Sequence, residues 1–170
     1  TAAPFANQFS FEFDGVDEFL EIQNSPLDVL SSVNQISISF WYNTNQTGFG
    51  FIFTQSSSFE IYKSTSWFMG IAGNVSFPSG NPPVIYNEWV NVVVVINKTI
   101  STGSVTFYQN SVSGGNQSYS GNLAVGTNWF NVPLNIARRA NNTFFYDGLL
   151  DEVSMWNTEL SSSAVTEIYN

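Results

Sequence analysis

The stretch Ile36-Ser-Ile-Ser-Phe-Trp-Tyr42 decides the fold class of this chain. Successive side chains of a β-strand point to opposite faces. The four large residues at even positions therefore share one face, whereas Trp41 and the two serines share the other. This alternation predicts a strand with one face in a core and the other face partly exposed to water.

A second stretch, Trp89-Val-Asn-Val-Val-Val-Val-Ile96, begins with alternation and loses it in the middle. Four consecutive valines leave no polar face. Such a run is typical of a central strand that is covered on both sides. We therefore expect this strand to lie deep in a sheet.

Similar short runs recur along the chain, separated by clusters of Gly, Pro, Asn and Ser, and they predict about ten strands or more. Besides the two stretches above, the predicted strands are residues 9–13, 19–22, 49–53, 59–62, 67–71, 105–108, 134–137 and 149–156. Residues 27–30 and, more convincingly, residues 161–169 favour a helix, the latter beginning after Ser161 as a potential cap. The pattern predicts an all-β sandwich or barrel with a short C-terminal helix.

The composition is that of one domain with a large core. The chain has 170 residues, of which 43% are hydrophobic, 16% aromatic and only 10% charged. We expect residues 1–170 to form a single domain, with residues 1–8 as an N-terminal extension. The start Thr1-Ala-Ala-Pro4 lacks a signal-peptide pattern and an initiator Met, so the chain is interpreted as a processed or excised piece.

The charge balance disfavours two classes of partner. Thirteen acidic residues against four basic ones, Lys63, Lys98, Arg138 and Arg139, give a net charge of −9. This sign is wrong for binding the phosphates of nucleic acid or of an anionic membrane surface. No apolar run of about 18 residues is present, so membrane insertion is not expected either.

An ordered set of motifs resembles one known family. The opening Phe11-Glu-Phe-Asp-Gly-Val-Asp17 resembles its F-D-G-x-D-D start, residues 36–41 its F-T-I-S-x-W strand, residues 145–156 its F-x-G-x-I-D-E-V-R-I-W strand, and residues 160–169 its closing L-S-x-x-E-I-x-x-L-Y. The chain is thus identified as a member of the laminin-G-like, concanavalin A-like lectin/glucanase superfamily. The resemblance implies a two-sheet antiparallel jelly-roll sandwich whose first and last strands are neighbours.

The same resemblance implies a structural Ca²⁺ site between the first and last strands. Its predicted ligands are Asp14, the Gly15 carbonyl, Asp17, Asp151 and Glu152. Calcium takes six to eight oxygen ligands, which this set would supply. The alternative is that Asp14 closes a turn and Asp151 accepts hydrogen bonds from backbone amides, without an ion.

Catalytic residues are scarce. The sequence contains no His and no Cys, which excludes Ser-His-Asp and Cys-His centres and the usual zinc ligands. The spacing Glu12-x-Asp14 with Asp17 and Glu18 superficially resembles the E-x-D-x-x-E strand of glucanases, but Gly15 interrupts the strand between the carboxylates. We therefore predict that the chain is not an enzyme, with a glycoside hydrolase as the lesser alternative.

Four aromatic residues are candidates for a glycan platform, because the C–H faces of sugars stack on flat rings. They are Trp67, Phe68, Trp129 and Phe130, with packing in the core as the alternative for each. Arg138 and Arg139 are candidates for pairing with a carboxylate of a partner or of a sugar acid, or locally with Asp147 or Glu152.

These observations favour a non-catalytic recognition or adhesion module that binds glycans or a surface protein, in an extracellular, cell-surface or virion-surface location. The alternative is a structural module, such as a virion decoration or fibre domain or a surface-layer subunit, whose partners are the other subunits of that assembly.

Overall fold

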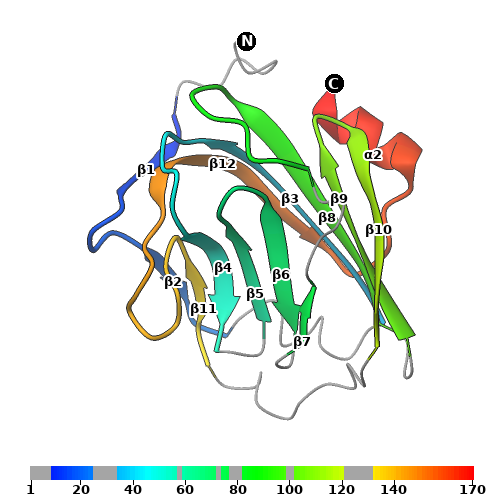
Figure 1. Ribbon diagram of the computed structural model, residues 1–170, viewed down its shortest axis with the longest axis horizontal. Helices are drawn as coiled ribbons and strands as arrows, with labels where there is room; N and C mark the ends of the chain where they lie inside the picture. Colours follow the sequence, from blue (N-terminus) through cyan, green and yellow to red (C-terminus); the bar gives the residue numbers. More distant parts are fainter. Residues whose placement is uncertain are drawn as a thin grey trace.

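The computed structural model describes residues 9–24, 34–56, 59–71, 74–76, 82–98, 102–120 and 132–170. The strands in these residues form two antiparallel sheets of six strands each (Figure 1). The first sheet has the order β1 (Phe11–Asp14), β12 (Asp147–Trp156), β3 (Gln35–Asn43), β8 (Val90–Lys98), β9 (Thr102–Gln109) and β10 (Val112–Ser120). The second has the order β2 (Leu20–Ile22), β11 (Leu134–Ile136), β4 (Gly50–Gln55), β5 (Phe59–Lys63), β6 (Trp67–Ile71) and β7 (Asn74–Ser76). The predicted jelly-roll sandwich is confirmed.

The first and last strands are neighbours, as the family resemblance implies. β1 pairs with β12 in antiparallel register, with Phe11 opposite Leu150 and Asp14 opposite Asp147. Both strands lie at one edge of the first sheet. The first and last strands of the sequence therefore lie side by side at one edge of the same sheet.

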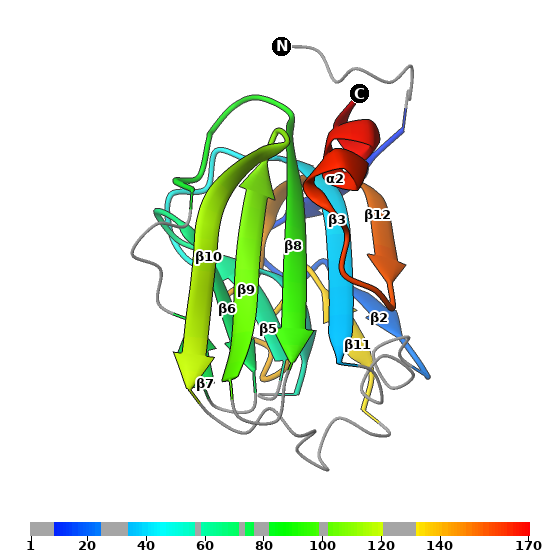
Figure 2. The same cartoon turned by 90° about the vertical axis from the view of Figure 1, so that its right-hand side faces the viewer.

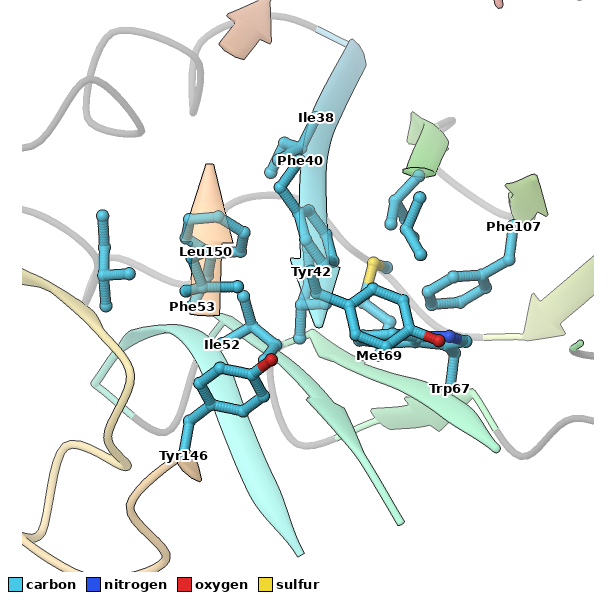
Figure 3. Close-up of a cluster of buried hydrophobic side chains, with 14 of the residues drawn as sticks. Ile38, Phe40, Tyr42, Ile52, Phe53, Trp67, Met69, Phe107, Tyr146 and Leu150 are labelled. Atoms are coloured by element: carbon cyan, nitrogen blue, oxygen red, sulfur yellow. The ribbon is translucent and has the colours of Figure 1, made fainter. Parts of the chain in front are cut away.

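Large aromatic side chains fill the space between the two sheets (Figure 3). The ring of Trp67 from β6 meets Phe40 and Tyr42 from β3 edge to face, with centroid distances of 5.4 and 5.1 Å. The indole nitrogen of Trp67 donates to Gln109 Oε1 at 3.3 Å. Such aromatic pairs contribute about 0.5–1.5 kcal/mol each beyond the burial of their surface, so this cluster ties the sheets together.

The valine run of β8 is covered on both faces, as predicted. Val92 and Val94 belong to the core between the sheets, whereas Val93 and Val95 pack on the outer side against Val165 of the helix α2 (Ser162–Tyr169). Figure 2 shows α2 lying against the outer face of the first sheet. A valine is therefore buried at every position in the middle of this strand.

The C-terminal helix begins where the sequence predicts. The N-cap is Ser161, whose Oγ accepts a hydrogen bond from the amide of Ala164 at 3.2 Å. At the other end Tyr169 stacks on Trp41 of β3, with ring centroids 5.8 Å apart. The cap and the stacked rings hold the helix on the sheet. No helix in the described part of the chain is long and apolar enough to cross a membrane.

Two strands, β7 and β10, were not predicted. β10 contains Gly114 and Gly115 and several serines, which favour a turn, but the structure has a register shift within the strand at residues 113–116. As an edge strand, β10 pairs with β9 alone and needs no continuous apolar face. The predicted helical turn at residues 27–30 and the predicted extension at residues 1–8 lie outside the described residues.

A buried lysine anchors the loop that follows β3. Lys63 ends β5 with its side chain fully buried, and its Nζ donates to the backbone carbonyls of Gln46 and Gly48. Burial lowers the pKa of Lys63 to about 8, against a weaker opposing effect of Asp147. The ammonium group therefore holds the loop through these two hydrogen bonds, but it loses its hydration shell, which disfavours its charged form.

The lowered pKa of Lys63 predicts a pH dependence of stability. Between about pH 8 and the ordinary lysine pKa near 10.4, the unfolded state binds more protons than the folded state, so the free energy of unfolding rises with pH. Burial raises the pKa of Tyr42 and Tyr146, which makes the unfolding free energy fall above about pH 10. Urea unfolding between pH 7.5 and 9.5 should show the rise in the parent chain and not in Lys63→Met; equal slopes in both proteins would contradict this assignment.

Candidate functional site

The outer face of the second sheet carries side chains that alternate with those of the core. In β5, Phe59 and Ile61 point into the core, so Glu60 and Tyr62 point outward. In β6, Trp67 and Met69 point inward, so Phe68 points outward opposite Tyr62 in the strand register. Because the apolar residues of these strands pack in the core, the polar and aromatic residues between them lie on the outer face of the second sheet.

Five rings on this face form a continuous cluster, which we call the outer aromatic row: Phe68, Tyr62, Phe51, Phe144 and Phe49. Phe68 and Tyr62 stack nearly parallel at 5.1 Å, and Tyr62 and Phe51 stack at 4.7 Å. Phe144 lies 5.9 Å from Phe51, and Phe49 lies 5.7 Å from Phe144. Phe51 is buried beneath its neighbours, whereas Phe49 and Phe144 are 49% and 47% exposed, so the row offers flat rings to solvent.

The loop of residues 137–146, between β11 and β12, brings Phe144 onto the row. The Ala137 amide donates to the Ile52 carbonyl at 3.0 Å, and the Phe51 amide donates to the Phe144 carbonyl at 3.3 Å. The Tyr146 amide closes the loop by donating to the Ala137 carbonyl at 2.8 Å. These backbone bonds fasten the loop to β4 and fix the positions of its side chains.

Arg138 holds the base of this loop. Its guanidinium donates to Asn135 Oδ1 at 2.7 and 2.9 Å, to Asn142 Oδ1 at 2.6 Å and to Glu21 Oε2 at 2.9 Å. Its Cζ also lies 3.4 Å from the centroid of the Phe19 ring, a cation–π contact. With all three nitrogens engaged, Arg138 is a structural residue.

Arg139 faces the other way and remains partly available. Its Nε donates to Glu60 Oε1 at 2.9 Å, and its Cζ lies 5.2 Å from the Phe51 ring. Glu60, Arg139, Ala140, Asn141 and Ser56 line a hollow of about 310 Å³ beside the outer aromatic row. A concave polar hollow next to exposed rings is a typical arrangement of a ligand site.

The contrast between the two arginines is testable by mutation. Arg138→Met should lower the free energy of unfolding by about 2 kcal/mol, because it removes several charge-assisted hydrogen bonds and one cation–π contact. Urea denaturation measures the loss. Glu18→Gln, a charge change at the exposed 14–18 turn, is the control and should cost much less. Equal losses in the two variants would show that Arg138 does not hold the loop.

The predicted glycan platform is only partly brought together. The prediction for Trp67 is wrong, because its ring is fully buried between the sheets. Phe68 lies in the outer aromatic row, on the predicted kind of surface. Trp129 and Phe130 lie outside the described residues. The local ion pairs expected with Asp147 or Glu152 are also wrong, since Arg138 and Arg139 pair with Glu21 and Glu60.

The remaining residues of the row were missed because their signal is indirect. Tyr62 and Glu60 alternate with the apolar residues of β5, which marks them as outward-facing from sequence alone. Phe49 and Phe51 were read only as part of a strand. Phe144 comes from a loop, and no sequence periodicity predicts which sheet a loop covers.

The five predicted calcium ligands do not form one site. The register places Asp147 opposite Asp14, and Asp151 follows four residues later, roughly 13 Å along the strand at the usual rise per residue. Within the described ranges, no three Asp, Glu, His or Cys side chains are grouped so that they could hold a metal ion. The predicted cluster is therefore wrong, and the residues do not fit a shared ion.

Asp14 and Asp151 have local roles instead. Asp14 Oδ1 accepts from the amides of Val16 and Asp17 at 2.8 and 3.4 Å, closing the turn in which Gly15 has a φ of +75°. The hydrogen bond from Val16 is the main cause that lowers the pKa of Asp14. Asp151 Oδ1 accepts from the Glu152 amide at 2.8 Å. These contacts agree with the alternative interpretation, in which Asp14 closes a turn and Asp151 accepts a hydrogen bond from a backbone amide without a bound ion.

Calcium binding by the chain stays a prediction, and melting curves in CaCl₂ and in EDTA test it. Because the register separates Asp14 from Asp151, we expect no calcium-dependent rise in Tm that requires both residues. Asp14→Asn should lower Tm equally in both solutions, by weakening the turn. A rise with calcium that Asp14→Asn and Asp151→Asn each remove would contradict this geometry.

Two of the carboxylates of the glucanase-like spacing, Asp14 and Glu18, are engaged in the turn. A Glu18 carboxylate oxygen accepts from the Asp14 amide at 3.0 Å, and Asp14 ends β1 where Gly15 begins the turn. Retaining glycosidases need two carboxylates about 5–5.5 Å apart that flank the scissile bond. Glu18 folded back onto the backbone of its own turn does not meet that description.

With the fold and site described, comparison with known proteins places the chain in a family. The model of the Concanavalin A-like lectin/glucanases superfamily matches residues 14–166. The chain belongs to this superfamily. The Concanavalin A-like match thus runs from the last residue of β1 into α2. No curated protein matches the sequence significantly.

Solved structures of similar fold include a carbohydrate-binding module. The CBM40 of the Ruminococcus gnavus IT-sialidase, bound to α2,3-sialyllactose, has a TM-score of 0.66 at 11% identity, covering 94% of this chain and 95% of that one. Domain 4 of the arabinanase AbnA from Geobacillus stearothermophilus, in complex with arabinotriose, has a TM-score of 0.58 at 20% identity, covering 82% and 68%. A pentraxin from Limulus polyphemus has a TM-score of 0.67 at 14% identity, covering 94% and 80%. At these identities the likeness establishes the fold.

Proposed function

We propose that this chain is a non-catalytic carbohydrate-binding module that holds a glycan on the outer face of its second sheet. The observation that carries the proposal is the outer aromatic row beside the hollow at Arg139 and Glu60. Rings bind the apolar face of a sugar, and polar groups next to them bind its hydroxyls. Both kinds of group lie together on this face.

What covers the two sheets supports this location for the proposed site. On the first sheet, α2 packs over Val93 and Val95, and Tyr169 covers Trp41. On the second sheet, Phe49 and Phe144 remain about half exposed. Exposed aromatic rings on a folded surface are typical of binding sites, so this face is the better candidate.

Two further lines of support concern the class of function. Two proteins of similar fold are solved with oligosaccharides, arabinotriose and sialyllactose, and one of them is part of an extracellular arabinanase. The chain lacks His and Cys, and two carboxylates of the glucanase-like spacing, Asp14 and Glu18, bond within a turn. We accordingly propose recognition without catalysis, in an extracellular or surface protein. A role as a virion or surface-layer subunit stays a prediction.

The proposal predicts that the exposed rings contribute to glycan binding. Screening on a glycan array should identify a ligand, and calorimetry with that ligand should show that Tyr62→Ala and Phe144→Ala each weaken binding at least tenfold, about 1.4 kcal/mol, because a stacking ring is lost. Val112→Ala, which removes an exposed side chain from β10 in the other sheet, is the matched control and should bind normally.

Two results would overturn this function. One is the absence of binding to any glycan of the array by the folded chain. The other is a ligand whose affinity is unchanged in both ring variants, which would place its site elsewhere.

A further inference from the structure

We infer that the hollow at Arg139 and Glu60 selects neutral sugars and discriminates against sugars that carry a carboxylate. This inference rests on the proposed function and names the ligand class of the same face. It follows from which hydrogen-bonding groups of these two side chains bond each other, which remain open to a ligand, and how their opposite charges are placed.

Arg139 and Glu60 form a pair that is fixed at one end and open at the other. The bond from Arg139 Nε to Glu60 Oε1, 2.9 Å long, uses one guanidinium nitrogen and one carboxylate oxygen. Among the described residues, no other group bonds the two Nη groups of Arg139 or the Oε2 atom of Glu60. The Arg139 side chain is 35% exposed and that of Glu60 is 10% exposed, so the open end faces the hollow.

This open end matches the chemistry of sugar hydroxyls. The Nη groups only donate hydrogen bonds, and Glu60 Oε2 only accepts them. A hydroxyl both donates and accepts, so neighbouring hydroxyls of one sugar satisfy donor and acceptor together. Ser56 and Asn141, which also line the hollow, add neutral polar groups. Arg139 Cζ lies 5.2 Å from the centroid of the Phe51 ring, so the hollow adjoins the outer aromatic row.

A carboxylate would gain much less in this place. Because Arg139 and Glu60 are bonded at 2.9 Å, a carboxylate at the Nη groups of Arg139 would also lie near the negative charge of Glu60, so repulsion offsets part of the attraction. The cost of removing its hydration shell would remain. A hydroxyl has no such electrostatic penalty, which favours the neutral sugar.

No other cation compensates for Glu60 on the described part of this face. Arg138 is engaged by Glu21, Asn135 and Asn142, and Lys63 points into the core. The chain as a whole carries a net charge of −9, which repels anionic glycans at long range.

The pKa of Tyr62 responds to the opposite charges of Glu60 and Arg139. After burial, the nearby Glu60 carboxylate is the larger electrostatic influence on the pKa of Tyr62 and raises it, whereas Arg139 has a smaller, opposite effect. At the Tyr62 hydroxyl, the effect of Glu60 therefore outweighs that of Arg139.

A matched glycan array tests the inference. The probes are oligosaccharides of glucose, galactose and mannose, each printed in two forms, one with the C6 hydroxymethyl group intact and one with it oxidised to a carboxylate. Arabinotriose and α2,3-sialyllactose are added. We expect the parent chain to bind at least one neutral probe at least tenfold more tightly than its carboxylated partner.

Two charge variants make the test specific to the pair. Glu60→Gln keeps the size of the side chain but leaves the Arg139 charge uncompensated, so the affinity ratio of carboxylated to neutral probe should rise at least tenfold. Glu21→Gln makes the same charge change beside Arg138, whose nitrogens are all engaged, and should leave the ratio unchanged.

The outcomes separate the inference from the function on which it rests. A parent chain that prefers the carboxylated probes, or a ratio that Glu60→Gln does not change, overturns the inference and leaves glycan binding standing. Failure of the folded parent chain to bind any probe overturns the proposed function and the inference with it.

Discussion

Every strand of a two-sheet sandwich must turn one face toward the partner sheet, and in this chain the buried ring of Trp67 fixes that choice for the second sheet. It meets Phe40 and Tyr42 of the facing strand edge to face, an arrangement that cannot shift by one residue without exposing the indole. Because side chains alternate, the next residue, Phe68, is then forced outward. The row of rings on the outer face is thus a consequence of how the core packs.

The two sheets differ in what lies behind them. The first sheet is covered by α2, and this cover explains why β8 has valine on both faces. The second sheet has no helix on its outer face in the described part of the chain, and its outward positions hold rings and an ion pair. The same architecture therefore produces one face for packing and one face suited to recognition.

The neighbouring arginines illustrate how tertiary contacts assign roles to identical residues. Arg138 meets Glu21 and two asparagines and becomes part of the framework, whereas Arg139, one residue later, meets Glu60 and keeps its terminal nitrogens toward a hollow. The framework residue fixes the loop that carries the other. Rigid support of this kind keeps a binding group in place without a conformational cost at each binding event.

The sequence by itself determined the sandwich, the two-sided burial of β8 and the capped helix after Ser161, because period-two patterns and capping residues act over a few neighbouring positions. It missed β10, whose glycines and serines are tolerated at an edge that pairs on one side only. It also placed Trp67 and Phe68 on one platform, although adjacent strand residues must face opposite ways. Only the tertiary structure decided the register that separates Asp14 from Asp151. It also decided the fold of the loop that brings Arg139 to Glu60 and Phe144 to Phe51. Those contacts join residues far apart in the chain, and they depend on which strands pair and in what register, which no local pattern specifies.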